Sequence, residues 1–241
     1  MPPNLALQRT PATRAVFGSA DGFRVWPGPL SFIVRRRRAT EVGSLTELPE
    51  GLPVPTNDGA CDHLLGSTLP SLPLPSTAGG VVDLAARPGL TVAYFYPMTG
   101  RPGVPLPVGW DAIPGARGCT PQACGFRDHA RELAALGASV VGVSTQPLVE
   151  QAEAATRLHL PFELLSDEQL VFVASLRLPV FEAGGRQLVK RLTLVVSGGL
   201  VSQVFYPVFP PDAHAAQVVS WLAQRQAEPA AAVDGRKAGR H

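Results

Sequence analysis

The stretch LTVAYFY at residues 90–96 predicts a buried strand, because its residues are β-branched, apolar or aromatic. Pro88-Gly89 precedes it and Pro97 follows it. After a loop rich in proline and glycine, residues 120–136 repeat apolar side chains at intervals of three and four, which predicts an amphipathic helix ending at Gly137. The chain thus begins its regular part with a strand followed by a helix.

The same alternation continues towards the C-terminus. A short strand is expected at 81–84 and later strands at 139–144, 162–165, 190–196 and 200–206, with helices at 148–158, 166–176 and 212–226. Gly198-Gly199 predicts a hairpin turn. Ser166 or Asp167 is expected to cap the helix at 166–176. This order predicts an α/β fold, a three-layer sandwich around a mixed β-sheet.

Composition excludes several classes of protein. The 241 residues are 45% hydrophobic and 17% charged, which is below the ~25% of an average soluble protein and allows a large core. The net charge of +2 gives no global signal for nucleic acid. No apolar run approaches the ~18–20 residues of a membrane helix. We therefore expect neither a nucleic-acid nor a membrane partner.

The basic charge is concentrated at the start of the chain. Residues 1–40 hold seven arginines against one aspartate, a balance of +6, which leaves −4 for residues 41–241. We expect a disordered basic extension at 1–45, a linker at 46–60, one folded domain at 61–226 and a disordered tail at 227–241. A misassigned start codon or an organelle transit peptide would also explain the extension. The absence of an export signal favours a cytoplasmic location.

The three cysteines, Cys61, Cys119 and Cys124, are too few for a disulfide scaffold, so reduced thiols and redox chemistry are expected. Cys119 lies where the loop enters the helix, and Pro121 suits the first helical turn. The unpaired N–H groups and the helix dipole at this end favour a thiolate over a thiol. These residues alone are compatible with a reactive cysteine and equally with a small apolar residue at a helix end.

Cys124 follows Cys119 by five positions. On an intact α-helix the two Cα atoms would be ~8.7 Å apart, beyond the ~7 Å limit for a disulfide. Either the two cysteines are not a disulfide couple, or the first turn unwinds to form one. A metal site is a weak alternative, because no zinc-type spacing occurs and His129 would be the only local third ligand.

The segment GCTPQACGFRD at 118–128 resembles the active-site segment of the peroxiredoxins, closest to the bacterioferritin-comigratory or Q-type subgroup. Residues 140–145, 164–167, 190–196 and 216–222 continue the resemblance in register, over about residues 60–226. The resemblance implies a thioredoxin-like fold and an antioxidant enzyme of cell redox homeostasis. Its substrate would be hydrogen peroxide or an organic hydroperoxide. The resemblance implies no cofactor, and the oligomeric states common in the subgroup imply a monomer or weak dimer.

The resemblance also implies roles for individual residues. Cys119 would be the peroxidatic cysteine, which becomes a sulfenic acid, and Cys124 the resolving cysteine, which forms a redox-active disulfide with it. Thioredoxin or a similar dithiol would reduce that disulfide. Arg191 would lie beside Cys119, stabilise the thiolate and orient the peroxide.

The chain departs from the family pattern in the active-site loop. Ala116 stands where peroxiredoxins have a threonine three residues before the peroxidatic cysteine, and Pro97 lies 22 residues before it. We infer an insertion at about 101–117, which would shape a peroxide pocket, dock the reductant or pack on the surface. Pro97 and Thr99 are expected to bind substrate, and the Thr99 hydroxyl would replace the threonine hydroxyl that is missing at Ala116. Cys61 is expected to be a structural thiol.

Two other functions remain open, and the departure at Ala116 supports the first of them. The first is a thioredoxin-fold protein that exchanges disulfides or binds a partner without reducing peroxide. The second, weaker alternative is a metal or copper chaperone on the same fold. All three share one fold, so only the chemistry of the site separates them.

Overall fold

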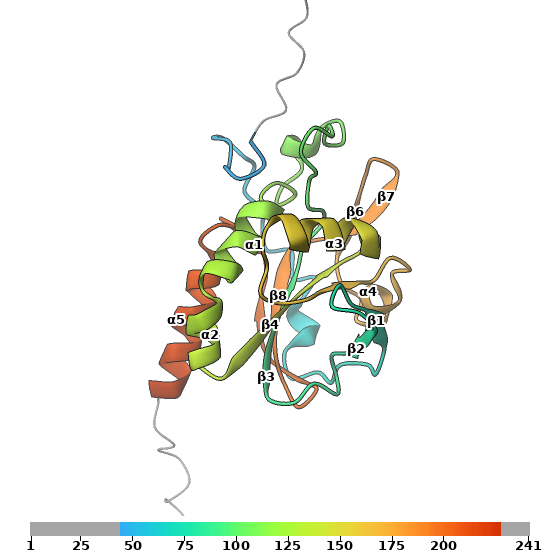
Figure 1. Ribbon diagram of the computed structural model, residues 1–241. Helices are drawn as coiled ribbons and strands as arrows, with labels where there is room; N and C mark the ends of the chain where they lie inside the picture. Colours follow the sequence, from blue (N-terminus) through green and yellow to red (C-terminus); the bar gives the residue numbers. More distant parts are fainter. Residues whose placement is uncertain (1–43, 228–241) are drawn as a thin grey trace, which may run out of the picture. The chain divides into compact units, whose positions relative to one another are not determined.

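The computed structural model describes residues 44–227 (Figure 1). Its 3₁₀ helices are η1 (Asp62–Leu64) and η2 (Trp110–Ala112), and its α-helices are α1 (Cys119–Asp128), α2 (Ala130–Ala135), α3 (Leu148–Arg157), α4 (Val171–Ser175) and α5 (His214–Ala227). The strands are β1 (Pro73–Pro75), β2 (Val81–Asp83), β3 (Leu90–Phe95), β4 (Ala138–Ser144), β5 (Leu164–Ser166), β6 (Val180–Ala183), β7 (Arg186–Val189), β8 (Leu192–Ser197) and β9 (Leu200–Phe205).

A five-stranded mixed sheet in the order β5-β4-β3-β8-β9 forms the centre. β3, β4 and β5 are parallel, and β8 runs antiparallel to β3, with Phe95 opposite Val143 on one side and Leu192 on the other. β9 returns from β8 through the predicted glycine turn. The prediction of a mixed sheet is therefore confirmed. β1–β2 and β6–β7 form two separate two-stranded ribbons.

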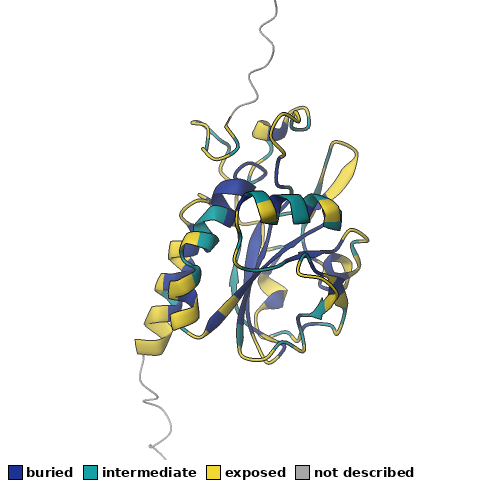
Figure 2. Cartoon of the chain, viewed as in Figure 1, coloured by how far each residue is buried: buried dark blue, intermediate teal, exposed yellow. Residues whose placement is uncertain are grey.

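Apolar side chains cover both faces of this sheet. One face packs against α1, α2 and α5 through residues such as Phe126, Leu133 and Val218. The other face packs against η1, the β1–β2 ribbon and α4. Figure 2 shows the sheet as a buried layer between these covers. Burying each large apolar side chain contributes about 1.5–3 kcal/mol, so the sheet is a rigid base for the loops at its ends.

The single helix predicted at 120–136 is wrong, because the chain forms two helices that meet at His129. His129 has φ −93° and ψ 6°, outside the α-helical region. Phe126 and Leu133 are seven positions apart and both face the core. Seven residues are nearly two helical turns, so the apolar repeat continues across the break and does not reveal it.

Two further elements differ from the prediction. The helix expected at 166–176 is only α4, because Ser166 still belongs to β5 and Leu170, directly before α4, has a left-handed conformation with φ 58°. Asp167 does act as a cap, since its carboxylate accepts the N–H groups of Phe172 at 3.1 Å and Val173 at 2.8 Å. The β6–β7 hairpin was not predicted, although Gly184-Gly185 is a typical turn signal.

Residues 46–60, predicted as a linker, contain no helix or strand, yet several of their side chains lie against the domain. The basic extension lies almost wholly outside the described residues, and so does the C-terminal tail after residue 227. The domain boundaries stay predictions. Within residues 44–227, no helix has the length and apolar character needed to cross a membrane.

Candidate active site

Cys119 begins α1, as predicted, and its side chain is buried. Gly118 precedes it with φ 101°, a left-handed conformation that favours glycine. Because Gly118 has no side chain, no side-chain hydrogen bond caps the helix, and Pro121 needs none. The first turn of α1 therefore has no side-chain acceptor for its free N–H groups, and Cys119 lies at the positive end of the helix dipole.

Arg191 lies directly before β8 and is buried beside Cys119. Its Nη2 is 3.1 Å from the Cys119 Sγ, and the same nitrogen donates to the carbonyls of Ala116 at 3.3 Å and Arg117 at 3.2 Å. Its Nε donates to the Gly115 carbonyl at 3.3 Å. One guanidinium thus holds the loop before Cys119 and places a permanent positive charge beside the sulfur.

Gln122 is a site residue that the sequence analysis missed. It is fully buried, and its Oε1 accepts a hydrogen bond from the Arg191 Nη1. Its Nε2 has no partner among the described residues. Gln122 lies three positions after Cys119, the spacing that puts two side chains on one helix face, and this spacing was a usable signal.

Cys124 lies on the same intact helix as Cys119 and is half-buried. Both sulfurs are free thiols in the structure. The expected geometry therefore holds: α1 keeps the two cysteines too far apart for a disulfide unless its first turn unwinds. Arg127 pairs with Asp128 at 2.8 Å and donates to the Leu158 carbonyl at 3.0 Å, which ties the second half of α1 to the chain after α3.

Pro97 and Thr99 follow β3 but are not joined to Cys119 by any hydrogen bond among the described residues. The Pro97 carbonyl accepts from the Ser144 hydroxyl at 3.1 Å. The Thr99 N–H donates to the Gln146 Oε1 at 2.7 Å, and the Gln146 Nε2 donates back to the Thr99 carbonyl at 3.3 Å. This buried amide fixes the backbone of the loop and leaves the Thr99 hydroxyl outside the pairing.

The insertion at 101–117 packs against the β6–β7 hairpin. Trp110 is buried with Ala116 and Leu188, and its ring lies 6.0 Å from that of Phe181. A cavity of about 500 Å³ lies beside this cluster, lined by Thr99, Gln146, residues of the insertion and residues of the hairpin. Of the three predicted roles, packing is thus seen directly, and the cavity offers a space for a ligand.

Cys61 lies in a different electrostatic environment. It is buried at the start of η1, and burial is the main reason that its pKa rises to about 12. The carboxylates of Asp58 and Asp62 raise the pKa further, while Lys190 lowers it. This thiol is protonated at neutral pH, which agrees with a structural role.

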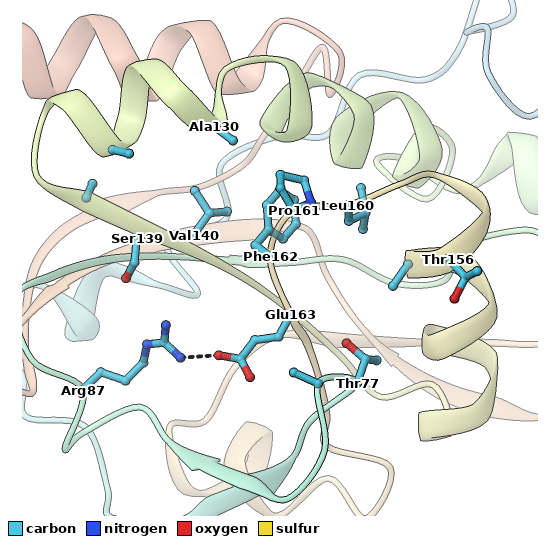
Figure 3. A pocket seen from close by; sticks show the side chains of 14 residues that line it. Thr77, Arg87, Ala130, Ser139, Val140, Thr156, Leu160, Pro161, Phe162 and Glu163 are labelled. Carbon is cyan, nitrogen blue, oxygen red and sulfur yellow. Dashed lines mark hydrogen bonds and ion pairs between the residues drawn. The ribbon is translucent and has the colours of Figure 1, made fainter.

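A second cavity, of about 700 Å³, lies between α2, α3 and the start of β5 and contains none of the predicted site residues in its lining (Figure 3). Its rim carries the ion pair between Arg87 and Glu163, at 2.6 Å. Within the described residues, no cluster of three or more metal-ligating side chains occurs.

Comparison with known proteins agrees with this geometry. The model of the Redoxin family matches residues 64–219. This chain belongs to the Redoxin family. Its relatives in that family include peroxiredoxins of the Q type, so it is a peroxiredoxin-family thiol peroxidase with a thioredoxin-like fold.

The relatives come from plants and bacteria. Peroxiredoxin Q of Sedum lineare, a chloroplastic protein, is 33% identical over 65% of this chain and 76% of its own length. The rice peroxiredoxin Q, also chloroplastic, is 29% identical over 77% of this chain and 81% of its own.

Solved structures give the same result. The peroxidoxin BcpB of Mycobacterium tuberculosis is 32% identical, with a TM-score of 0.54 over 66% of this chain and 96% of the other. Peroxiredoxin Q of Xanthomonas campestris is 25% identical, with a TM-score of 0.51 over 65% of this chain and 94% of the other. The cytoplasmic location predicted above stays a prediction.

Proposed function

We propose that this peroxiredoxin reduces hydrogen peroxide or organic hydroperoxides with Cys119 as the peroxidatic and Cys124 as the resolving cysteine. The observation that carries the proposal is the 3.1 Å contact between the Arg191 guanidinium and the Cys119 sulfur at the start of α1. A thiolate there attacks the terminal peroxide oxygen, and the O–O bond breaks. The sulfur becomes a sulfenic acid, and the other oxygen leaves with a proton as water or alcohol.

The second half of the cycle regenerates the thiols. After the first turn of α1 unwinds, the Cys124 sulfur attacks the Cys119 sulfenic sulfur and the S–O bond breaks. The hydroxide takes up the proton of the Cys124 thiol and leaves as water, and a disulfide remains. A thioredoxin-like dithiol then reduces this disulfide by thiol–disulfide exchange and is itself oxidised. The sequence order of the two cysteines on one helix supports this assignment.

Mass spectrometry after alkylation of free thiols tests the proposal. The protein is compared with and without one equivalent of hydrogen peroxide. A Cys119–Cys124 linkage that forms within seconds is the expected result. Oxidation that stops at the Cys119 sulfenic acid would remove Cys124 from the resolving role. No reaction at either cysteine would overturn the peroxidase mechanism and favour disulfide exchange, the alternative suggested by Ala116.

The Thr99 hydroxyl is the part of the proposal that concerns substrate binding. Thr99→Val keeps the shape of the side chain and removes the hydroxyl, so it should lower kcat/KM for hydroperoxide about tenfold or more, as loss of one positioned donor does. The matched control is Thr156→Val on α3, whose hydroxyl bonds only to its own helix. Wild-type rates in Thr99→Val would rule out this role.

A further inference from the structure

Residues 44–58, here called the strap, run over the loop that carries Cys119. The Arg117 Nη2 donates to the Ser44 carbonyl at 2.7 Å. A Cβ atom placed on Gly118 would come within 2.8 Å of the Leu48 Cδ2, so Leu48 lies directly on the residue before Cys119. Pro55 lies against Gly115 in the same way, at 3.6 Å from such a Cβ.

Both ends of the strap are fixed. At its start, the Leu45 side chain packs against Gly100, beside Leu106 of the insertion. At its end, the Asp58 carboxylate pairs with the Lys190 Nζ at 3.0 Å and accepts from the Tyr206 hydroxyl at 2.8 Å. These two hydrogen bonds are the main reason that the pKa of Asp58 falls to about 2, so the carboxylate is ionised at neutral pH.

The strap contacts the part of the site that must move. A disulfide between Cys119 and Cys124 requires the first turn of α1 to unwind, because the intact helix holds the Cα atoms ~8.7 Å apart. Unwinding moves Cys119, and the two residues that precede it in the chain are tied to the strap. Those two residues are Gly118, which contacts Leu48, and Arg117, which bonds to Ser44. We therefore expect unwinding to work against the strap contacts.

We propose that the strap holds the first turn of α1 helical and so sets the lifetime of the Cys119 sulfenic acid. The inference rests on the proposed function. While the turn stays folded, Cys124 is out of reach and the sulfenic acid persists. A second peroxide molecule then oxidises it to the sulfinic acid and is itself reduced to water, a step that competes with disulfide formation. A tighter strap favours the sulfinic acid, and a looser one favours the disulfide.

The test uses the full-length Leu45→Ser/Leu48→Ser variant and the matched control Val54→Ser, a strap residue that is 62% exposed. One equivalent of hydrogen peroxide is added, and the reaction is quenched at millisecond to second intervals and read by mass spectrometry. In the double variant, we expect the disulfide to form about five- to tenfold faster, with sulfenic acid formation within twofold of wild type. The peroxide concentration that converts half of Cys119 to sulfinic acid should rise by the same factor. Val54→Ser should behave as wild type.

A second variant and a second readout keep the result decisive. Asp58→Asn loosens the far end of the strap without touching the active-site loop, and it should accelerate disulfide formation to a smaller extent. Unchanged or slower disulfide formation in both variants would overturn the strap while leaving the peroxidase proposal standing. If wild-type Cys119 is not oxidised at all, the proposed function fails. Hydrogen exchange at the Gln122 and Ala123 amides then tests whether the strap holds the first turn of α1 helical. The exchange should be faster in the double variant than in the wild type, without peroxide.

Discussion

Cys119 and Cys61 are equally buried, with exposed fractions of 3% and 2%, yet their surroundings carry opposite charge. Cys119 faces the Arg191 guanidinium at 3.1 Å and the start of a helix. Cys61 lies near the Asp58 and Asp62 carboxylates, and burial together with these charges raises its pKa to about 12. The comparison teaches that burial does not decide which thiol reacts. The two sites differ in the charged groups that lie beside the sulfur, a guanidinium at Cys119 and carboxylates at Cys61.

Replacing each cysteine by serine tests most directly which of the two thiols reacts. Cys119→Ser removes the nucleophile and should abolish hydroperoxide reduction, a loss of at least about a thousandfold. Cys61→Ser should keep activity within twofold of wild type. Consumption of hydrogen peroxide in the presence of a dithiol measures both. Full activity in Cys119→Ser, or its loss in a folded Cys61→Ser, would reverse the roles of the two thiols.

Alkylation of Cys61 sharpens the comparison. A pKa raised from 9.0 to about 12 lowers the thiolate fraction at pH 8 about a thousandfold, so iodoacetamide should label Cys61 at least that much more slowly in the native protein than in guanidinium. The half-buried Cys124 is the internal control and should be labelled in the native protein. Comparable native and unfolded rates at Cys61 would contradict its assignment as an inert thiol.

Removing the cation tests the other side of the comparison. Arg191→Met deletes the charged contact with the Cys119 sulfur. A hydrogen bond to a charged group is worth about 1.5–3 kcal/mol, so the second-order rate of Cys119 oxidation should fall about ten- to a hundredfold. Lys190→Met is the matched control, since Lys190 is the adjacent cation and pairs with Asp58 instead. Thermal melting separates this effect from loss of the fold. Equal losses in two folded variants would show that the position of the charge is unimportant.

Some of this site could be predicted and some could not, for physical reasons. The cysteines, Pro121 and the helix start are local in sequence, and helix-end rules apply to them directly. Arg191 is 72 positions from Cys119, and its position before a strand carries no local signal. The family resemblance pointed to Arg191, and the geometry places it beside the sulfur. The contacts of the strap with Gly118 and Arg117 are also long-range, so the sequence indicated only a linker.

The fold shows the same division. β3, β4 and α5 lie within a few residues of their predicted bounds because their apolar pattern is strong. The break at His129 was invisible because the helical repeat continues across it, and α4 was shortened because Ser166 pairs within β5. Local patterns therefore give the order of elements, while their ends depend on contacts with distant residues.

His214 on α5 gives the smallest expected effect, a pH dependence of stability to which the Arg191 charge also contributes. Burial is the main reason that the His214 pKa falls from 6.5 to about 4, and the Arg191 charge adds to this shift. Its ring nitrogens bond to the Thr193 hydroxyl at 2.8 Å and the Gln217 amide oxygen at 3.1 Å. Below pH 6.5 the unfolded chain takes up a proton that the folded protein refuses until about pH 4. The free energy of unfolding should therefore decrease as the pH is lowered, by ~2 kcal/mol between pH 7.5 and pH 5.

Urea unfolding at a series of pH values measures this loss. His214→Gln should remove most of the pH dependence between 6.5 and 5, whereas His129→Gln, which changes a partly exposed residue at the break between α1 and α2, should keep it. Arg191→Met should shrink the dependence without removing it, because burial remains when the cation is gone. A pH dependence that His214→Gln leaves intact would place the titrating group elsewhere. A pH dependence that Arg191→Met leaves intact would show that the Arg191 charge does not affect the pKa of His214.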